Sequence, residues 1–223
     1  MNKQSRFLSD GRLAAVIVVA LLVIDQIIKI WVKTHMALYD SFIITNWFRI
    51  YFIENNGMAY GMTFIPKIGL SLFRIAAVAA IGYYLSQLVK KEHRTGYVVC
   101  LAMIMAGAAG NIFDSLFYGL CFDASTPYHI SQLVPFGTGY APALQGRVVD
   151  MFYFPLIVTN WPEWMPWVGG DKFVFFSPVF NFADSCISVG VVILILFFRK
   201  DLESINDIFT WKKEKPIQPN ETE

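Results

Sequence analysis

Four long apolar stretches dominate the hydrophobic pattern of the chain. They cover residues 13–33, 68–89, 96–118 and 178–198. Each is close to the roughly 20 predominantly apolar residues that a helix needs to cross the hydrocarbon core of a bilayer. The pattern therefore predicts four transmembrane helices in a single polytopic membrane domain that occupies residues 1–223.

Two longer segments separate these stretches. The first, residues 34–67, contains a run rich in β-branched and aromatic residues at 43–53, which predicts short β-strands. A Gly- and Asn-rich stretch at 55–61 follows and is typical of a turn. The second, residues 119–177, is long for a loop without structure of its own, and its aromatic-rich second part suits the interface between membrane and water.

The composition agrees with a membrane protein and excludes several other classes. Of the 223 residues, 56% are apolar and only 16% are charged, whereas soluble domains average about 45–50% and about 25%. The mean hydropathy is +0.49. Few charges, a net charge of +1 and three Cys argue against a disordered chain, a nucleic-acid-binding protein and a disulfide-stapled secreted domain.

The distribution of Lys and Arg predicts the orientation of the helices. Eleven of these residues lie before the first stretch, between the second and third, or in the tail at 199–223. Only five lie at residues 33–67 and 119–177, across far more of the chain. Because cytoplasmic loops carry the excess of Lys and Arg, both termini are expected in the cytoplasm.

The first apolar stretch could instead be a cleaved signal peptide, because it follows basic residues. No small-x-small cleavage pattern comes after it. Asp25, Gln26 and Lys29 follow instead, which favours a retained membrane anchor.

Ionisable residues near the spans carry the functional information, because charges in a bilayer are rare and tend to be functional or paired. Asp25 and Lys29 are four residues apart and lie on one helix face, which suits an ion pair. The pair either eases its own insertion, with Lys29 reaching out to the interface, or Asp25 helps to hold a polar site between helices. Arg74, one turn into the second span, is most simply read as reaching outward.

Two spans offer an amide followed by a carboxyl three residues later: Asn111 with Asp114, and Asn181 with Asp184. The small residues before Asn111 suit close packing of helices. Asp150 supplies one more carboxyl just before the aromatic segment. The pattern predicts that at least three carboxyls converge at the outer membrane face.

Carboxyls are the plausible reactive groups, because the chain has no zinc-ligand spacing, nucleophile elbow or phosphate loop. Two carboxyls about 4 Å apart repel by about 4 kcal/mol at an effective dielectric near 20, equivalent to about three pK units. One would keep its proton while the other ionised, which is the condition for an aspartic peptidase. Neither a metal nor an organic cofactor is expected.

Five short blocks of polar and small residues occur in order along almost the whole chain. They are Asp25-Gln26-x-x-Lys29, Asn55-x-Gly57-x-Ala59-Tyr60-Gly61, Gly107-x-x-Gly110-Asn111-x-x-Asp114, Val148-Val149-Asp150-Met151 and Pro178-x-Phe180-Asn181-x-Ala183-Asp184-Ser185. In this order, on four predicted spans, they resemble the bacterial lipoprotein signal peptidases (type II, aspartic peptidase family A8).

The resemblance implies an all-α integral membrane enzyme of the bacterial inner membrane. Its four transmembrane helices would carry a small extracytoplasmic β-cradle and an extended periplasmic loop or helix over the site. It also implies cleavage of diacylglyceryl-modified prolipoproteins on the amino side of the lipidated Cys. Prolipoproteins and membrane lipids are the expected partners, nucleic acid is not, and a monomer is expected.

By motif position, the resemblance implies that Asp150 and Asp184 are the catalytic dyad. Seven further residues match supporting polar and small positions of the family. These are Asp25, Lys29, Asn55, Gly107, Asn111, Asp114 and Asn181.

The chain departs from the family pattern in two respects. An Arg usually follows the position of Asp114, but here it is Ser115, and Arg147 is the candidate substitute. The spacings from Asp114 to Asp150 and on to Asp184 are also long. The extra residues fall in outer loops, where insertions are tolerated, and would form a larger lid.

Two other hypotheses fit parts of the pattern. A small proton-coupled carrier would need acids near the bilayer midplane and an inverted repeat, and neither is visible. A catalytically dead homologue that binds lipoproteins is disfavoured by the intact set of carboxyls.

Overall fold

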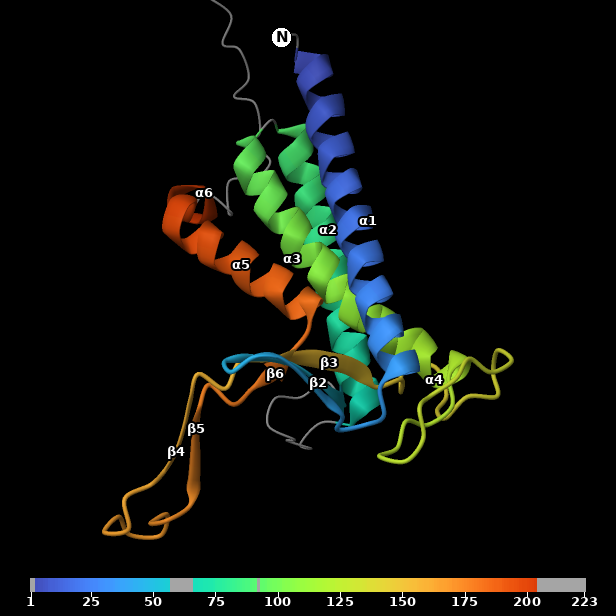
Figure 1. Cartoon of the computed structure of the whole chain (residues 1–223). Helices are drawn as coiled ribbons and strands as arrows, with labels where there is room; N and C mark the ends of the chain where they lie inside the picture. Colours follow the sequence, from blue (N-terminus) through green and yellow to red (C-terminus); the bar gives the residue numbers. More distant parts are fainter. Residues whose placement is uncertain (1–2, 57–65, 92, 204–223) are drawn as a thin grey trace, which may run out of the picture.

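The computed structural model describes residues 3–56, 66–91 and 93–203, and within these the side chains of residues 10–202. Three long apolar helices and a shorter one lie side by side, and a small antiparallel sheet crosses one end of them (Figure 1). The turn expected at 57–61 and the tail beyond residue 203 fall outside the described residues.

The three long helices confirm the first three apolar stretches as helical. They are α1 (Lys3–His35), α2 (Lys67–Lys90) and α3 (Thr95–Phe113). A five-residue π-helix, η2 (Asp114–Tyr118), and the short α4 (Gly119–Cys121) continue α3. By length and composition, residues 10–35, 67–90 and 95–121 are each sufficient to cross a membrane.

The fourth apolar stretch is only partly helical, which corrects the prediction of a span over 178–198. Helix α5 (Phe182–Phe197) has 16 residues, and the short α6 (Arg199–Glu203) follows it. Val179–Phe180 forms strand β6 instead. Asn181 caps α5 with its side chain and fixes where the helix begins, a boundary that apolar character alone does not reveal.

Helix α3 is the centre of the bundle and packs against α1, α2 and α5. The approach of α3 to α5 is close at Gly107, where an added Cβ would lie 2.3 Å from the Ala183 carbonyl oxygen. Only glycine permits this contact, so Gly107 is a packing residue that brings the start of α5 against α3.

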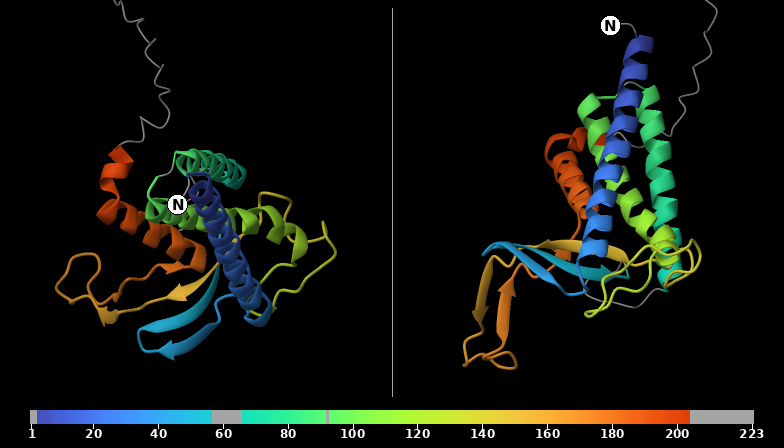
Figure 2. Two further views of the ribbon diagram at one scale, coloured as in Figure 1. Left: turned by 90° about the horizontal axis from the view of Figure 1, so that it is seen from above. Right: turned by 45° about the vertical axis from the view of Figure 1, so that its right-hand side comes forward.

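The larger sheet contains four antiparallel strands in the order β1-β2-β3-β6. Strands β1 (Ser41–Thr45) and β2 (Phe48–Asn55) confirm the strands predicted from the β-branched run, and β3 (Val148–Tyr153) pairs with β2. The sheet lies across the helix ends from which α5 begins (Figures 1 and 2). It therefore brings β3 next to the first turn of α5.

The aromatic segment forms a separate hairpin of β4 (Ile157–Asn160) and β5 (Lys172–Phe175). Its tip points away from the helices and exposes Trp164 and Trp167 almost completely (Figure 1). The aromatic part of the second outer segment is therefore a hairpin in residues 154–177 that projects from the sheet.

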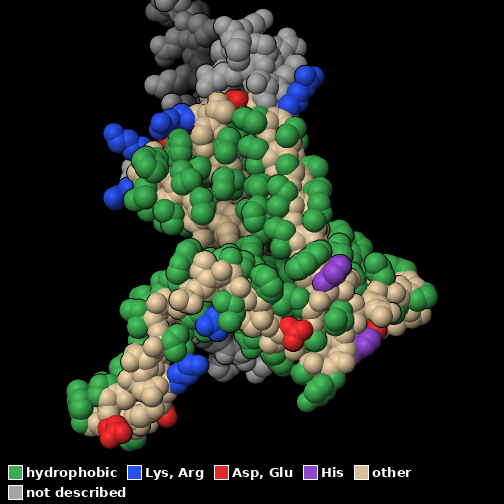
Figure 3. Space-filling view, viewed as in Figure 1, with side chains coloured by type: hydrophobic (Ala, Val, Ile, Leu, Met, Phe, Trp, Pro, Cys, Tyr) green, Lys and Arg blue, Asp and Glu red, His purple; other side chains and the backbone are tan. Residues whose placement is uncertain are grey.

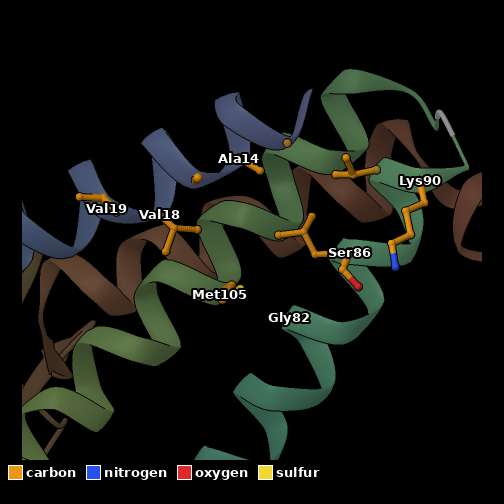
Figure 4. A pocket seen from close by; sticks show the side chains of 11 residues that line it. Ala14, Val18, Val19, Gly82, Ser86, Lys90 and Met105 are labelled. Carbon is orange, nitrogen blue, oxygen red and sulfur yellow. The ribbon is translucent and has the colours of Figure 1, made fainter. Parts of the chain in front are cut away.

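Hydrophobic side chains cover the sides of the helices, and Lys and Arg gather at the helix ends opposite the sheet (Figure 3). An apolar groove of about 480 Å³ lies between α1, α2 and α3 in that half of the bundle (Figure 4). Lys90 at the end of α2 lies at its rim. The groove is far from the sheet, whereas the buried carboxyls lie beside the sheet.

Candidate active site

Two amide side chains connect Asp150 on β3 with Asp184 on α5. Asn181 Nδ2 donates to Asp150 Oδ1 at 2.6 Å and to Asn111 Oδ1 at 3.1 Å. Asn111 Nδ2 in turn donates to Asp184 Oδ1 at 2.8 Å. Both predicted dyad carboxyls are therefore held in one hydrogen-bond network, with the amides oriented by their partners.

The start of α5 orders Asp184. The Asn181 side chain accepts a hydrogen bond from the Asp184 backbone N–H at 2.9 Å, and Asp184 Oδ2 accepts one from the Asn181 backbone N–H at 3.4 Å. This reciprocal arrangement is a capping box. It places Asp184 in the first turn of a helix, where the helix dipole favours an ionised carboxylate.

Asp25 on α1 also binds the start of α5. Its Oδ1 accepts a hydrogen bond from the Ala183 backbone N–H at 3.0 Å. An N–H that the helix leaves without an internal partner is thus satisfied by a side chain from a different helix. Asp25 thus takes part in a polar cluster between α1 and α5, and its role in a functional site stays a prediction.

Lys29 lies at the centre of this polar layer and is fully buried. Its Nζ contacts Asp25 Oδ2 at 3.0 Å, Asp114 Oδ2 at 2.9 Å and Asn111 Oδ1 at 2.8 Å. Three contacts use all three hydrogens of the ammonium group. The alternative in which Lys29 reaches out to the interface is therefore wrong, because spacing predicts the helix face of a residue and not its depth.

Asp150 is 2% exposed and accepts hydrogen bonds on both carboxyl oxygens, the second from Asn55 Nδ2 at 3.1 Å. Burial, followed by the charge of Asp184, raises the pKa of Asp150 to about 7, against the lowering effect of these hydrogen bonds and of Lys29. Asp184 is only half-buried. The two carboxyls thus occupy different environments, the usual basis for dividing acid and base roles.

Asp114 connects α3 with the sheet. It stands at the start of η2, and its Oδ2 accepts a hydrogen bond from the Val149 backbone N–H at 3.3 Å. Single-turn π-helices of this kind are frequent at functional sites. Because Val149 precedes Asp150, this bond fixes the strand that carries the buried carboxyl.

Two neutral polar residues of the network were not predicted as site residues. Gln26 Nε2 donates to Asp114 Oδ1 at 2.9 Å and to Asp25 Oδ2 at 3.1 Å, and the Tyr118 hydroxyl donates to Gln26 Oε1 at 3.0 Å. The signal was present in the sequence, since an amide next to Asp25 inside an apolar span needs partners of its own.

The first departure from the family pattern, Ser115 in place of an Arg, can be followed in the structure. Ser115 is buried and its hydroxyl donates to the Asn111 carbonyl oxygen at 3.1 Å. Arg147 Nη1 contacts Glu54 Oε2 at 3.1 Å. The salt bridge to Asp114 within the described residues is made by Lys29, so the guanidinium of Arg147 serves a different group of side chains.

Arg74 on α2 is half-buried, and it interacts electrostatically with the carboxyls of Asp184 and Asp150. It therefore faces the same site as the predicted dyad. The simple interpretation of an Arg that reaches outward omits this relationship.

No group of three or more His, Cys, Asp or Glu that could hold a metal ion occurs in the part of the chain that the structure describes. The chemistry of the arrangement is that of paired carboxyls oriented by amides. Such a pair can take a proton from water with one member and supply a proton with the other.

Comparison with known proteins identifies relatives over nearly the whole chain. Residues 17–200 match the family model described as signal peptidase (SPase) II. A lipoprotein signal peptidase of Porphyromonas gingivalis is 50% identical over 201 residues, covering 90% of this chain and 88% of that protein. One of Amoebophilus asiaticus is 35% identical over 190 residues, covering 81% and 75%.

A solved structure of a bacterial membrane enzyme has a similar fold. It superposes with a TM-score of 0.57 and is 23% identical in sequence, covering 92% of this chain and 94% of that one. The helices and the small antiparallel sheet thus recur in an experimentally determined membrane enzyme.

Proposed function

Because the chain belongs to the signal peptidase II family, whose members are aspartic peptidases that process prolipoproteins, we propose that Asp150 and Asp184 are its catalytic dyad. The observation that carries this proposal is the amide bridge between them, in which Asn181 contacts Asp150 and Asn111 contacts Asp184. Supporting polar residues found by motif position take part in the same network.

The different environments of the two carboxyls support the roles that we propose for them. Asp184, half-buried in the first turn of α5, is the ionised base that takes a proton from water. Asp150, whose pKa is about 7, is the protonated acid. As the water oxygen attacks the scissile carbonyl carbon, Asp150 gives its proton to the carbonyl oxygen.

Collapse of the tetrahedral intermediate completes the reaction. The carbon–nitrogen bond breaks and the amine of the following residue leaves with the proton that Asp184 accepted from water. The hydroxyl proton of the intermediate returns to Asp150 as the carboxylic acid product forms. Both residues end in their starting states, so the dyad is ready for another turnover.

The surrounding residues position this pair. Asn111 and Asn181 fix the carboxyl orientations, and Asn55 binds the second oxygen of Asp150. Lys29, held by Asp25 and Asp114, supplies the positive charge that keeps this polar layer stable in a membrane protein. Gly107 permits the close packing on which the geometry depends.

We place the site at the outer face of the bacterial inner membrane. In this arrangement α1, α2, α3 and the shorter α5 cross the bilayer as one polytopic domain over residues 1–223, and the sheet forms an extracytoplasmic cradle. Lys and Arg at the opposite helix ends support cytoplasmic termini (Figure 3).

The proposed substrates are diacylglyceryl-modified prolipoproteins, cut on the amino side of the lipidated Cys by a monomeric enzyme. Two acyl chains anchor such a substrate at about 0.8 kcal/mol per buried CH₂. Lateral diffusion in the outer leaflet then brings the scissile bond to the level of Asp150 and Asp184.

The test is processing of a diacylglyceryl-modified prolipoprotein by Asp150→Asn and Asp184→Asn variants purified in detergent. Each is expected to lose at least 10³-fold in rate while retaining the wild-type elution profile. Asp123→Asn is the matched control, because this acid pairs with His129 in the outer loop and lies outside the network. Near wild-type processing by either dyad variant would overturn the assignment.

A further inference from the structure

A second group of buried charges lies one helix turn further along α1 from Lys29. Lys33 Nζ contacts Glu54 Oε1 and donates to Ser125 Oγ at 2.9 Å, and Ser125 Oγ donates to the same Glu54 oxygen at 2.8 Å. Arg147 Nη1 binds the other Glu54 oxygen at 3.1 Å. We call Lys33, Glu54, Ser125 and Arg147 the Glu54 cluster.

The Glu54 cluster is largely shielded from water. The side chains of Lys33 and Glu54 are 0% and 2% exposed, and Ser125 is buried. The Lys33 ammonium lies 5.1 Å from the centre of the Tyr140 ring and 5.5 Å from that of Phe122. Arg147, at 42% exposed, closes the cluster toward water. Burying ionic groups is costly unless they are paired, so removing one member of this cluster should disturb the position of the others.

The sheet register relates this cluster to the dyad. Glu54 lies opposite Val149, and Asn55 lies opposite Val148. Because successive side chains of a strand point to opposite faces, Asn55 extends to the face on which Asp150 Oδ2 accepts its hydrogen bond, and Glu54 extends to the reverse face. The end of β2 thus has the Glu54 cluster on one face of the sheet and the Asn55 contact to Asp150 on the other face.

The long insertion before β3 contributes side chains that surround Glu54. It leaves α4 and returns to the same place, since the Ala141 N–H binds the Gly119 carbonyl at 3.0 Å and the Gly146 N–H binds the Ser115 carbonyl at 2.9 Å. Between these points it contributes Phe122, Ser125 and Tyr140, whose hydroxyl accepts a 2.6 Å hydrogen bond from the Arg147 N–H. The insertion therefore packs behind β2 and β3.

We propose that Glu54 is a positioning residue that holds the end of β2 so that Asn55 keeps its hydrogen bond to Asp150. The inference rests on the proposed role of Asp150 as the catalytic acid. Lys33 ties Glu54 to α1, Ser125 ties it to the insertion, and Arg147 ties it to the start of β3. The family resemblance leads one to expect an Arg at the position of Ser115. In this chain, Glu54 and the insertion together hold β3, the strand that carries Asp150, from the opposite face of the sheet.

The experiment measures the pH profile of prolipoprotein processing for Glu54→Gln, Asn55→Ala and the double variant, using the full chain in detergent. The charged groups that act on Asp150 from neighbouring elements are Asp184, Lys29 and Arg74, and none of them is changed. Loss of the Asn55 hydrogen bond, which stabilises the ionised carboxyl, raises the pH at which the alkaline limb falls.

Glu54→Gln is expected to lower kcat about tenfold with little change in KM and to move the alkaline limb upward, as Asn55→Ala does. In the double variant the effect of Glu54→Gln should disappear, because its route through Asn55 is already lost. A purely electrostatic effect of Glu54→Gln would shift the alkaline limb in the opposite direction. It would leave the positive charges of Lys33 and Arg147 uncompensated, which lowers the pH at which the alkaline limb falls. A downward shift that persists in the Asn55→Ala background would overturn the proposal.

Two further variants keep the test decisive. Ser125→Ala removes a hydroxyl that contacts both Lys33 and Glu54 but retains every charge. It should move the alkaline limb in the same direction by a smaller amount, even if Glu54→Gln does not fold. Asp171→Asn, at an exposed position just before β5, removes a carboxylate away from the cluster and should change nothing. If Asp150→Asn abolishes processing while Glu54→Gln and Ser125→Ala keep the wild-type profile, the dyad assignment stands and the role of Glu54 is wrong.

Discussion

Gly110 on α3 faces the carboxylate of Asp25 on α1 so closely that an added Cβ would lie 2.5 Å from Asp25 Oδ2. The same oxygen forms a salt bridge with Lys29 Nζ and accepts a hydrogen bond from Gln26 Nε2. The absence of a side chain at Gly110 is therefore what allows a buried carboxylate to sit between two helices. Asp25 Oδ2 therefore takes part both in the close packing of α1 against α3 and in the hydrogen bonds of the polar layer.

Gly110→Ala is expected to reduce processing at least tenfold and to lower the melting temperature in detergent, because the methyl group must displace Asp25 or spread α1 from α3. Gly82→Ala is the control, since its Cβ would meet only the Met105 side chain at an ordinary 3.5 Å. Equal behaviour of the two variants in both measurements would contradict the role given to Gly110.

Lys29→Met should be the most destabilising single change in the polar layer. It leaves the Asp25 and Asp114 carboxylates buried without a cation, a situation that costs about 3–5 kcal/mol. We expect poor folding and no processing. Lys172→Met on the exposed β5 strand removes the same charge without this penalty, and thermal unfolding of the two variants in detergent gives the comparison. A Lys29→Met variant as stable as Lys172→Met would contradict the burial argument.

Activity should be bell-shaped in pH, with the alkaline limb near the pKa of Asp150 at about 7. The limb falls as pH rises because Asp150 must hold a proton to act as the acid. The acidic limb falls as pH drops because Asp184 must be ionised. Initial rates from pH 4 to 10 provide the measurement. An alkaline limb unchanged by substitutions at Asn55 and Glu54 and lying above pH 9 would be inconsistent with this assignment.

The same pKa predicts a pH dependence of stability. Because the folded state raises the pKa of Asp150 above its ordinary value of 3.8, it binds more protons than the unfolded state between about pH 4 and 7. The free energy of unfolding therefore falls as pH rises across that window. Asp150→Asn should flatten this slope, which melting curves at several pH values can show, and an unchanged slope would mean that Asp150 is not the group responsible.

Chelation should leave the rate unchanged, because the two carboxyls supply both proton transfers. Processing with and without EDTA tests this expectation. Loss of turnover that added divalent metal restores would indicate different chemistry.

The sequence predicted the parts of the fold that depend on apolar length and on local residue preference. Three spans and the strands β1 and β2 are of this kind. The start of α5 was misplaced because one apolar run contains both β6 and a helix, and only the Asn181 cap separates them. Hydrophobicity gives no such boundary.

The site was predicted as far as single unusual residues allow. Carboxyls and amides in or next to the apolar stretches made Asp184 and Asn111 candidates, and the family resemblance paired Asp184 with Asp150 in the outer segment. The neutral Gln26 lies in one of the motif blocks but was not predicted as a site residue. The Glu54 cluster was not visible, because Glu54 lies in a strand and its partners Ser125 and Arg147 are 71 and 93 residues away. Only the closed insertion brings them together.

In the proposed arrangement, in which α5 crosses the bilayer with Asp184 toward its outer face, the short length of this helix has a consequence for the lipid around it. Sixteen helical residues span about 24 Å, less than the roughly 30 Å hydrocarbon thickness of a typical membrane. Such hydrophobic mismatch is relieved by local thinning of the lipid. Beside α5 the headgroup layer would dip toward Asp184, so that a lipid-anchored peptide bond reaches the carboxyls without its acyl chains having to leave the membrane.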